Sequence, residues 1–294
     1  PVRSGYAGEL RYGLLNLTYR KATGREAMAL HYARLAEQPG IEPELPLPFP
    51  SLNFDPETVK KTATRFGISS PYTVFCSGAE YGPAKRWPFF HELASKLDCR
   101  IVLLGSLSDR KEAEQIPGTN LVGQTTLDEA IDLIAGAAMV VTNDSGLMHV
   151  AAATGTPQVA LFGSSSPEHT PPMSPVARVL WLKIECSPCY ARECPLGHFR
   201  CMRELSVEQV LAATPIRRVN LNLGALSTEQ LRGLRAAGAT GYNIYQETYD
   251  RASYARVHLG GPKRDYDWRL AAPERGARAG MRRLGIGALL RGGE

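Results

Sequence analysis

This sequence has no long hydrophobic run, no recognisable leader and no strong excess of charge. No stretch of about 18 apolar residues occurs, so we expect no membrane-spanning helix. The 294 residues carry a formal net charge of only +5. That charge suits a phosphorylated or anionic ligand but is too small to argue for nucleic acid. The chain begins at Pro1 with what reads as mid-protein sequence, so we expect the natural N-terminus to lie upstream.

Proline content marks the first boundary along the chain. Residues 39–55 contain five prolines and cannot form a regular helix, so we interpret them as a linker. A helical period runs over 24–38, and we interpret residues 1–38 as the remnant of an N-terminal domain. After the linker, Asp55 is expected to cap a helix that begins at Pro56.

Strands and helices alternate from there to residue 216. Continuous apolar runs separated by helices of about ten residues are typical of a parallel sheet covered on both faces. This predicts an α/β, Rossmann-like domain over 56–216, in which Thr126 and Glu129 form a helix capping box. The expected strands are 72–78, 100–106, 120–124, 139–144 and 157–163, and the expected helices are 87–97, 109–116, 126–137, 146–154 and 206–216.

Small polar residues gather where these strands end. In parallel sheets ligands bind beyond the carboxyl ends of the strands, so these ends predict one binding rim. The residues concerned are Ser77-Gly78, Gly105-Ser106, Asn143 to Gly146, and Gly163 to Ser166.

Residues 78–88, "GAEYGPAKRWP", are the first candidate segment on this rim. Gly78 lets a backbone approach a ligand closely, and Lys85 and Arg86 place two cations just before a helix. Cations next to a helix N-terminus are what a phosphate group needs. The alternative is a solvated basic turn.

Residues 143–149 are the second candidate segment. Asn143 and Asp144 end a strand, and a helix begins at Ser145, Gly146 and Leu147, so free N–H groups and the positive end of the helix dipole point to an anion. Alternatively, Asp144 and Ser145 only cap that helix. His149, near the helix start, is by itself usually a packing residue.

The polar, proline-rich loop 162–175 is the third candidate segment. It follows what we take to be the last strand, and long loops at this edge often act as lids.

Four stretches together resemble a known family. They are 8–16 "GELRYGLLN", 78–88, 102–106 "VLLGS" and 140–172. Over about residues 5–215 the chain is similar to the bacterial lipopolysaccharide heptosyltransferases of glycosyltransferase family 9, in particular to those that add the second core heptose. The resemblance implies a GT-B architecture with ADP-heptose held mainly by the C-terminal domain.

The resemblance also implies roles for single residues. Lys85 would neutralise the donor diphosphate as ADP leaves. The amides of Ser145, Gly146 and Leu147 would hold phosphate oxygens, and Asp144 and His149 would position donor groups. Gly78, Arg86, Ser106 and Asn143 complete the expected substrate site. Transfer would invert the sugar by direct attack of an acceptor hydroxyl, with no metal obligatory.

The family's N-terminal domain supplies an aspartate as general base. No aspartate of this chain can be matched to it, so we expect the chain to bind donor without transferring heptose by itself.

Four cysteines fall within residues 186–201. In a cytosol-like protein, Cys186, Cys189, Cys194 and Cys201 favour structural zinc over disulfides. Redox or disulfide pairing, plain loop thiols and, more weakly, an iron–sulfur cluster are the alternatives. Cys76 and Cys99 are expected in the core.

The sequence changes character after residue 216 and becomes rich in arginine. Expected strands at 219–223, 241–246 and 284–289, with helices at 227–237 and 273–282, suggest a slice of a (βα) barrel. The motifs "IYQETY", "GPKRDYDWR" and "GIGALL" resemble radical S-adenosylmethionine lyases of the 2-iminoacetate synthase type. The CxxxCxxC motif of those enzymes is absent from the sequence, so we expect no lyase activity.

We therefore interpret the chain as two joined gene fragments, 1–216 and 217–294. The leading hypothesis is the donor-binding part of a heptosyltransferase, cytoplasmic or peripheral at the inner membrane, acting on the lipopolysaccharide core. A non-catalytic nucleotide-sugar or phosphate-binding module is one alternative. A metal-binding or interaction protein organised by the cysteines and the basic tail is another.

Overall fold

A six-stranded parallel sheet forms the centre of the first of two units into which the chain divides, residues 1–215 and 216–294. The computed structural model describes residues 2–8, 13–19, 24–214, 220–237, 239–281 and 283–288. Within these ranges, every helix is too short or too polar to cross a bilayer. The mixed α/β architecture expected from the sequence is confirmed.

The strand order of the large sheet is β5-β4-β3-β6-β7-β8, with every pair parallel. This is the doubly wound order in which the chain runs outward from one central strand and then outward from its neighbour. The strands are β3 (Tyr72–Cys76), β4 (Arg100–Leu103), β5 (Thr119–Asn120), β6 (Met139–Asn143), β7 (Gln158–Phe162) and β8 (Ala177–Trp181). The edge strand β8 was not expected from the sequence.

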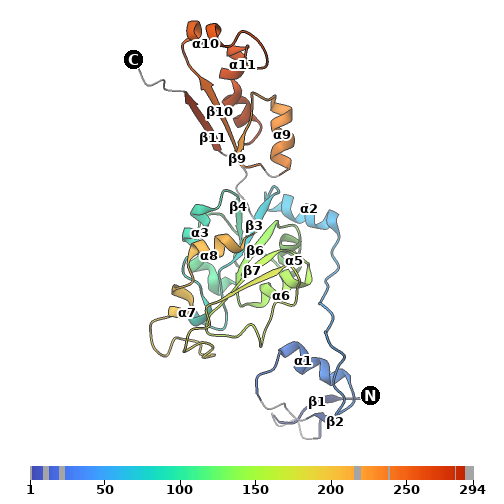
Figure 1. Ribbon diagram of the computed structural model, residues 1–294. Helices are drawn as coiled ribbons and strands as arrows, with labels where there is room; N and C mark the ends of the chain where they lie inside the picture. Colours follow the sequence, from blue (N-terminus) through green and yellow to red (C-terminus); the bar gives the residue numbers. More distant parts are fainter. Residues whose placement is uncertain are drawn as a thin grey trace. The chain divides into compact units, whose positions relative to one another are not determined.

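Helices cover both faces of this sheet (Figure 1). One face packs under α2 (Pro56–Arg65), α5 (Leu127–Ala135) and α6 (Gly146–Ala153), where Val74, Val102 and Val140 are fully buried. The other face carries α3 (Phe90–Lys96) and α8 (Val207–Ala213). Phe75 of β3 and Phe90 of α3 meet there edge to face, with ring centroids 5.4 Å apart.

Two predicted helix starts are confirmed. The Asp55 carboxylate accepts from the backbone N–H groups of Glu57 and Thr58, each at 3.2 Å, with Pro56 in the first turn. Thr126 and Glu129 form the reciprocal capping box at the start of α5. The shorter elements η2 (Pro83–Lys85), η3 (Leu107–Asp109), α4 (Arg110–Ala113) and α7 (Arg200–Arg203) lie in the connections.

The N-terminal segment is small. Strands β1 (Ser4–Tyr6) and β2 (Leu17–Tyr19) pair in parallel. The helix expected over 24–38 is shorter, with α1 (Met28–Ala33) followed by the 3-10 turn η1 (Arg34–Ala36). Residues 39–54 contain no helix or strand, as their prolines predict.

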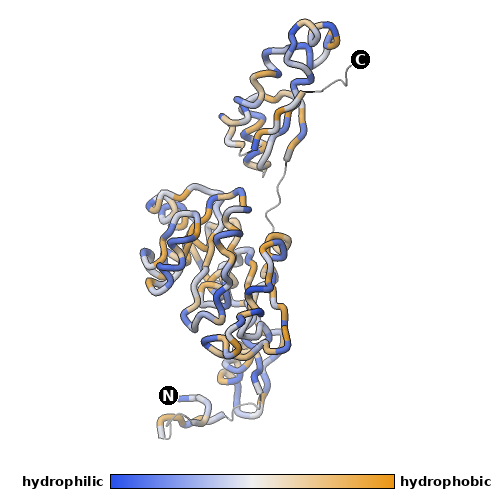
Figure 2. Tube along the Cα trace, turned by 90° about the vertical axis from the view of Figure 1, so that its left-hand side faces the viewer, coloured by the Kyte–Doolittle hydropathy of each residue, from blue (hydrophilic) through white to orange (hydrophobic). Residues whose placement is uncertain are grey.

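The C-terminal unit holds a three-stranded parallel sheet of order β11-β10-β9. Leu231, Tyr242 and Ala272 form its core with no exposed surface, while Ile286 of β11 is 64% exposed. Hydrophilic and hydrophobic stretches alternate along its trace (Figure 2). Its elements are β9 (Asn220–Asn222), α9 (Thr228–Ala236), β10 (Gly241–Glu247), α10 (Arg251–Val257), α11 (Tyr266–Leu270), α12 (Ala272–Arg278) and β11 (Arg283–Ala288).

Helices α10 and α11 lie where a loop was expected, because Asp250 and Asp265 cap them with side-chain bonds to Ser253 and Trp268. The expected end of the last strand, 289, lies outside the described residues. A relation to a barrel stays a prediction.

Leu133→Ala tests the core of the first unit. Leu133 is a fully buried residue of α5 in the core between this helix and the sheet, so its truncation should lower the free energy of unfolding by about 2–5 kcal/mol. We expect this in urea denaturation followed by tryptophan fluorescence in a Trp268→Phe background, which leaves Trp87 and Trp181 of the first unit as reporters. Leu231→Ala, in the core of the other unit, is the control and should leave that transition in place. Equal effects of the two variants would contradict the division.

Candidate nucleotide-sugar site

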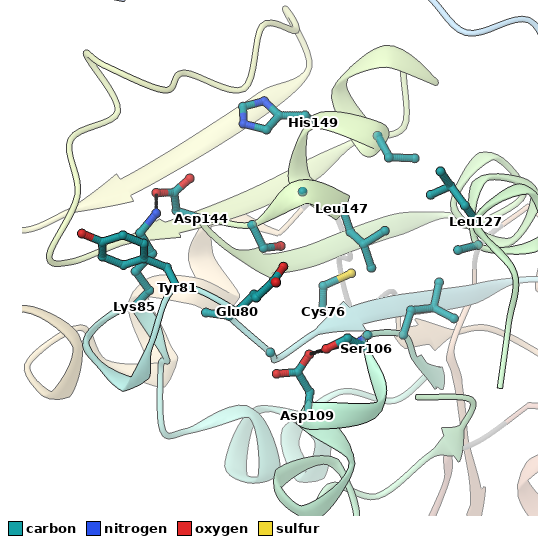
Figure 3. A pocket seen from close by; sticks show the side chains of 18 of the residues that line it. Cys76, Glu80, Tyr81, Lys85, Ser106, Asp109, Leu127, Asp144, Leu147 and His149 are labelled. Carbon is teal, nitrogen blue, oxygen red and sulfur yellow. Dashed lines mark hydrogen bonds and ion pairs between the residues drawn. The ribbon is translucent and has the colours of Figure 1, made fainter. Parts of the chain in front are cut away.

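A cavity of about 630 Å³ opens at the carboxyl ends of β3 and β6 (Figure 3). Strand order reverses between these two strands, which is where doubly wound sheets bind their ligands. The volume lies within the range of small-molecule sites. From the candidate list, the cavity is lined by Gly78, Lys85, Ser106, Asp144, Ser145, Gly146, Leu147 and His149.

Asn143 has a structural role instead of lining this cavity. Its side chain is fully buried, donates to the carbonyl of Ser77 at 2.7 Å and accepts from the N–H of Trp87 at 3.1 Å. The amide thereby ties the end of β6 to the chain that leaves β3 on either side of the lysine turn. Asn143 therefore supports the site, and its expected contact with substrate stays a prediction.

Lys85 forms the charged centre of the cavity. Its ammonium group donates to the carboxylate of Asp144 at 2.5 Å, and the side chains are only 16% and 4% exposed. Ser165 also donates to Asp144, at 2.6 Å. A buried carboxylate with an ammonium and a hydroxyl donor is satisfied, so the pair holds a cation at the rim at little cost to the fold.

The N-terminus of α6 stands beside this pair. Ser145 occupies the cap position, yet its side chain makes no capping bond, and its hydroxyl lies 3.3 Å from that of Thr142. The alternative that Asp144 and Ser145 only cap the helix is thus not what the structure shows. Gly146 and Leu147 of the first turn line the cavity, which places the positive end of the helix dipole at the cavity.

His149 lies one turn further along α6 and faces the same cavity (Figure 3). The surrounding protein displaces water from the ring and lowers its pKa, the Asp144 carboxylate raises it, and the Lys85 ammonium lowers it. The net pKa is below the ordinary value of 6.5, so the imidazole is mostly neutral at pH 7.

Arg86 does not line this cavity. Its guanidinium pairs with Glu112 at 2.5 Å and with the buried Asp109 at 3.3 Å. Asp109 in turn accepts from the N–H and hydroxyl of Ser106, at 3.2 and 2.6 Å. Gly78 is required beside it, because a Cβ atom there would lie 2.2 Å from the Asp109 side chain. Arg86 therefore stabilises the floor of the site without lining it.

Several further polar residues line the cavity without having been predicted as site residues, among them Glu80, Tyr81, Asp109, Thr125 and Thr170. Glu80 and Tyr81 belong to the 78–88 segment, between the glycine and the two cations predicted to bind there. The Tyr81 ring lies 4.9 Å from the Lys85 ammonium, a cation–π contact. Thr170 comes from the loop expected to act as a lid, and its hydroxyl is 3.5 Å from the Asp144 carboxylate.

The loop 162–175 is anchored at its start. Ser164, Ser165 and Ser166 are buried, so this part belongs to the core of the site. Farther along, the N–H of Met28 donates to the carbonyl of His169 at 2.8 Å, which joins the N-terminal segment to this loop. Its lid role stays a prediction.

The four clustered cysteines lie around a second, much smaller cavity of about 50 Å³ with His198. All six cysteines of the chain are free thiols. As the side chains stand in the described part of the chain, no three His, Cys, Asp or Glu residues are placed to hold a metal ion. Cys76 is buried in β3 as expected, and Cys99 is only partly buried.

A doubly wound sheet with a cation and a helix N-terminus at its switch point defines a nucleotide- or phosphate-binding α/β protein. Comparison with known proteins specifies the family. The family model of glycosyltransferase family 9 (heptosyltransferase) matches residues 1–200. The chain belongs to this family.

Two relatives show how far the similarity extends. The chain is 40% identical over 236 residues to lipopolysaccharide heptosyltransferase 2 of Escherichia coli (strain K12), covering 72% of this chain and 67% of that protein. The solved structure of E. coli ADP-heptose lps heptosyltransferase II superposes with a TM-score of 0.64 at 39% identity, covering 72% and 68%. The chain therefore spans about two thirds of the length of these relatives.

The C-terminal unit accounts for a separate, partial similarity. Over 72 residues, 24% of this chain, it is 43% identical to 2-iminoacetate synthase of Salmonella typhimurium, of which it covers only 19%. A match to so small a part of that enzyme supports the resemblance of the tail but no activity.

Asp144→Asn tests the electrostatics of the cavity. The Asp144 carboxylate raises the pKa of His149, so an isosteric neutral amide should move that pKa further below 6.5. We would follow the imidazole resonances by NMR across a pH titration. Glu57→Gln on the exposed surface of α2 is the control and should leave the titration unchanged. A His149 pKa that stays constant or rises in Asp144→Asn would contradict the arrangement.

Proposed function

We propose that residues 56–215 bind ADP-heptose as the donor half of a heptosyltransferase. The single observation behind this proposal is the Lys85–Asp144 pair, held at the switch point beside the first turn of α6. A diphosphate there gains one ammonium group and the N–H groups of a helix start. Lys85 would offset the charge that develops on the diphosphate as the sugar is transferred.

The lining of the cavity changes from one end to the other (Figure 3). Lys85, Tyr81 and Asp144 lie at one end, while Leu127 and Cys76 lie toward the other. Further apolar lining comes from Leu104, Ala130, Leu147 and Val150. An adenine ring suits the apolar end and the diphosphate and sugar suit the charged end, which orients ADP-heptose in one direction.

Asp144 and His149 would act on the donor as hydrogen-bonding groups. Asp144 already accepts from Lys85 and Ser165, and a neutral imidazole offers one donor and one acceptor nitrogen. Sugar hydroxyls need such mixed partners, whereas phosphate oxygens need donors only. We therefore assign Lys85 and the α6 amides to the diphosphate, and Asp144 and His149 to the sugar side.

The acceptor and the place of action follow from the relatives alone. The related enzymes are named for lipopolysaccharide, so we propose that the acceptor is the lipopolysaccharide inner core, reached at the cytoplasmic face of the inner membrane. No cofactor or catalytic metal is part of this proposal.

Calorimetry with ADP tests the donor site. We expect micromolar binding to the full chain. Lys85→Gln removes the charge but keeps a hydrogen-bond donor near Asp144, and should weaken binding about 10- to 100-fold, the value of a charge-assisted contact. Lys60→Ala, on the exposed surface of α2, is the matched lysine control and should bind like the wild type.

Two calorimetric results would contradict the proposed donor site. If ADP binds equally well to Lys85→Gln while circular dichroism shows an unchanged fold, Lys85 does not contact the diphosphate. If the wild-type chain binds no ADP, the donor-site proposal fails. Transfer of radiolabelled heptose then distinguishes a transferase from a donor-binding module, and we expect no transfer by this chain alone.

A further inference from the structure

We propose that Cys186, Cys189, Cys194 and Cys201 bind one structural zinc ion, and that the loop fixed by this ion braces the turn that carries Lys85. The cysteine loop lies between β8 and α7, outside the donor cavity. The functional site does not use these thiols, and the fold does not pair them as disulfides.

The four thiols share one small space. All of them line the cavity of about 50 Å³, together with His198, Leu196 and Phe199. This volume has room for an ion or a few water molecules and is far smaller than the usual site of an organic ligand. Thiolates are the ligands that select zinc among common metals, and four of them leave no open position for catalysis.

The backbone after Cys194 forms a tight turn close to the sulfur atom of this cysteine. Gly197 and Phe199 have positive φ angles of 67° and 50°, and the N–H of Gly197 donates to the carbonyl of Cys194 at 3.0 Å. This tight turn brings the N–H of Phe199 to 3.4 Å from the Cys194 sulfur. A backbone donor aimed at sulfur stabilises the thiolate form, which is the form that binds a metal.

His198 supports the thiols without replacing one of them as a ligand. The N–H of Arg200 donates to His198 Nδ1 at 3.0 Å, so Nε2 is the ring nitrogen that can donate. Nε2 lies 3.9 Å from the sulfur of Cys186 and points a donor toward it. Outer groups of this kind orient the ligands of metal sites.

The thiols must turn inward to complete the site. No three candidate ligands in the described residues are placed to hold an ion as they stand, and Cys189 is exposed whereas Cys201 is buried. Rotation of these short side chains toward the shared cavity would close it. Because zinc binding then orders the loop, part of the binding free energy becomes folding free energy.

The same loop contacts the lysine turn directly. The N–H of Ala84 donates to the carbonyl of Arg192 at 3.0 Å, and Tyr81 donates to the carbonyl of Tyr190 at 2.6 Å. At Gly82, with φ of +147°, a Cβ atom would lie 2.4 Å from the Arg192 carbonyl oxygen. Ala84 lines the cysteine cavity as well. Lys85 thus follows a turn held by the segment between two of the proposed ligands.

Metal analysis of the purified full chain tests the zinc site. We expect about one zinc per chain by inductively coupled plasma mass spectrometry, as for a closed four-ligand site. Cys189→Ser and Cys194→Ser should lose most of this zinc, while Cys99→Ser, outside the cluster, should retain it. Titration of the wild-type thiols with a mercurial should release zinc to a colorimetric chelator, which needs no variant to fold.

Three results would overturn the site. The first is zinc-free protein that binds no zinc when titrated with it under reducing conditions. The second is a disulfide within the cluster in protein kept anaerobic. The third is iron in place of zinc.

The support that the cysteine loop gives to the lysine turn is tested separately, by measuring ADP affinity. This test rests on the proposed function. Zinc is removed with the mercurial, and the mercurial is then displaced from the cysteines by an excess of a small thiol that is dialysed away. The resulting zinc-free protein should bind ADP several-fold more weakly, and added zinc should restore the affinity. Unchanged ADP affinity would refute the brace while leaving the zinc site in place. Zinc-loaded protein that binds no ADP would instead refute the donor site.

Discussion

The ion pair between Lys85 and Asp144 is the interaction on which the site depends. Both side chains are largely withdrawn from water, and removing one partner of such a pair typically costs about 3–5 kcal/mol. The sheet must therefore deliver both groups to the same point. It does so because β3 and β6 are neighbours, and the lysine follows one strand while the aspartate follows the other.

The Lys85 ammonium, now paired with the Asp144 carboxylate, can exchange this partner for a more highly charged anion. A diphosphate presents more negative charge than one aspartate and accepts the helix N–H groups as well. Asp144 keeps Ser165 as a donor when the ammonium turns to the ligand. The pair thus accounts for a carboxylate in the proposed phosphate site, the feature that is hardest to understand from the sequence.

Much of the architecture could be predicted from the sequence because its signals are local. Buried parallel strands are continuous apolar runs, and the caps at Asp55 and Thr126 depend only on residues two or three positions away. The common rim of the site also follows, since parallel strands end at one edge of the sheet. The position of Lys85 as a cation at the rim follows from the sequence pattern, whereas the role proposed for it rests on the family resemblance.

Side-chain partners far along the chain could not be predicted. Asn143 was assigned to substrate, but its amide bonds to backbone 56 and 66 residues away. Arg86 is expected beside Lys85 at the substrate, but its guanidinium pairs with Glu112 and Asp109 instead. Strand β8 was missed because a proline-rich loop precedes it, and the two tail helices because arginine and tyrosine dominate their sequence.

A crystal structure with ADP bound tests the central claim most directly. The account predicts the adenine at the apolar end of the cavity and the diphosphate at the start of α6, with the Lys85 ammonium bonded to a phosphate oxygen. Asp144 should still accept from Ser165. ADP bound elsewhere, or a Lys85 ammonium that keeps Asp144 as its partner and makes no contact with phosphate, would contradict the account.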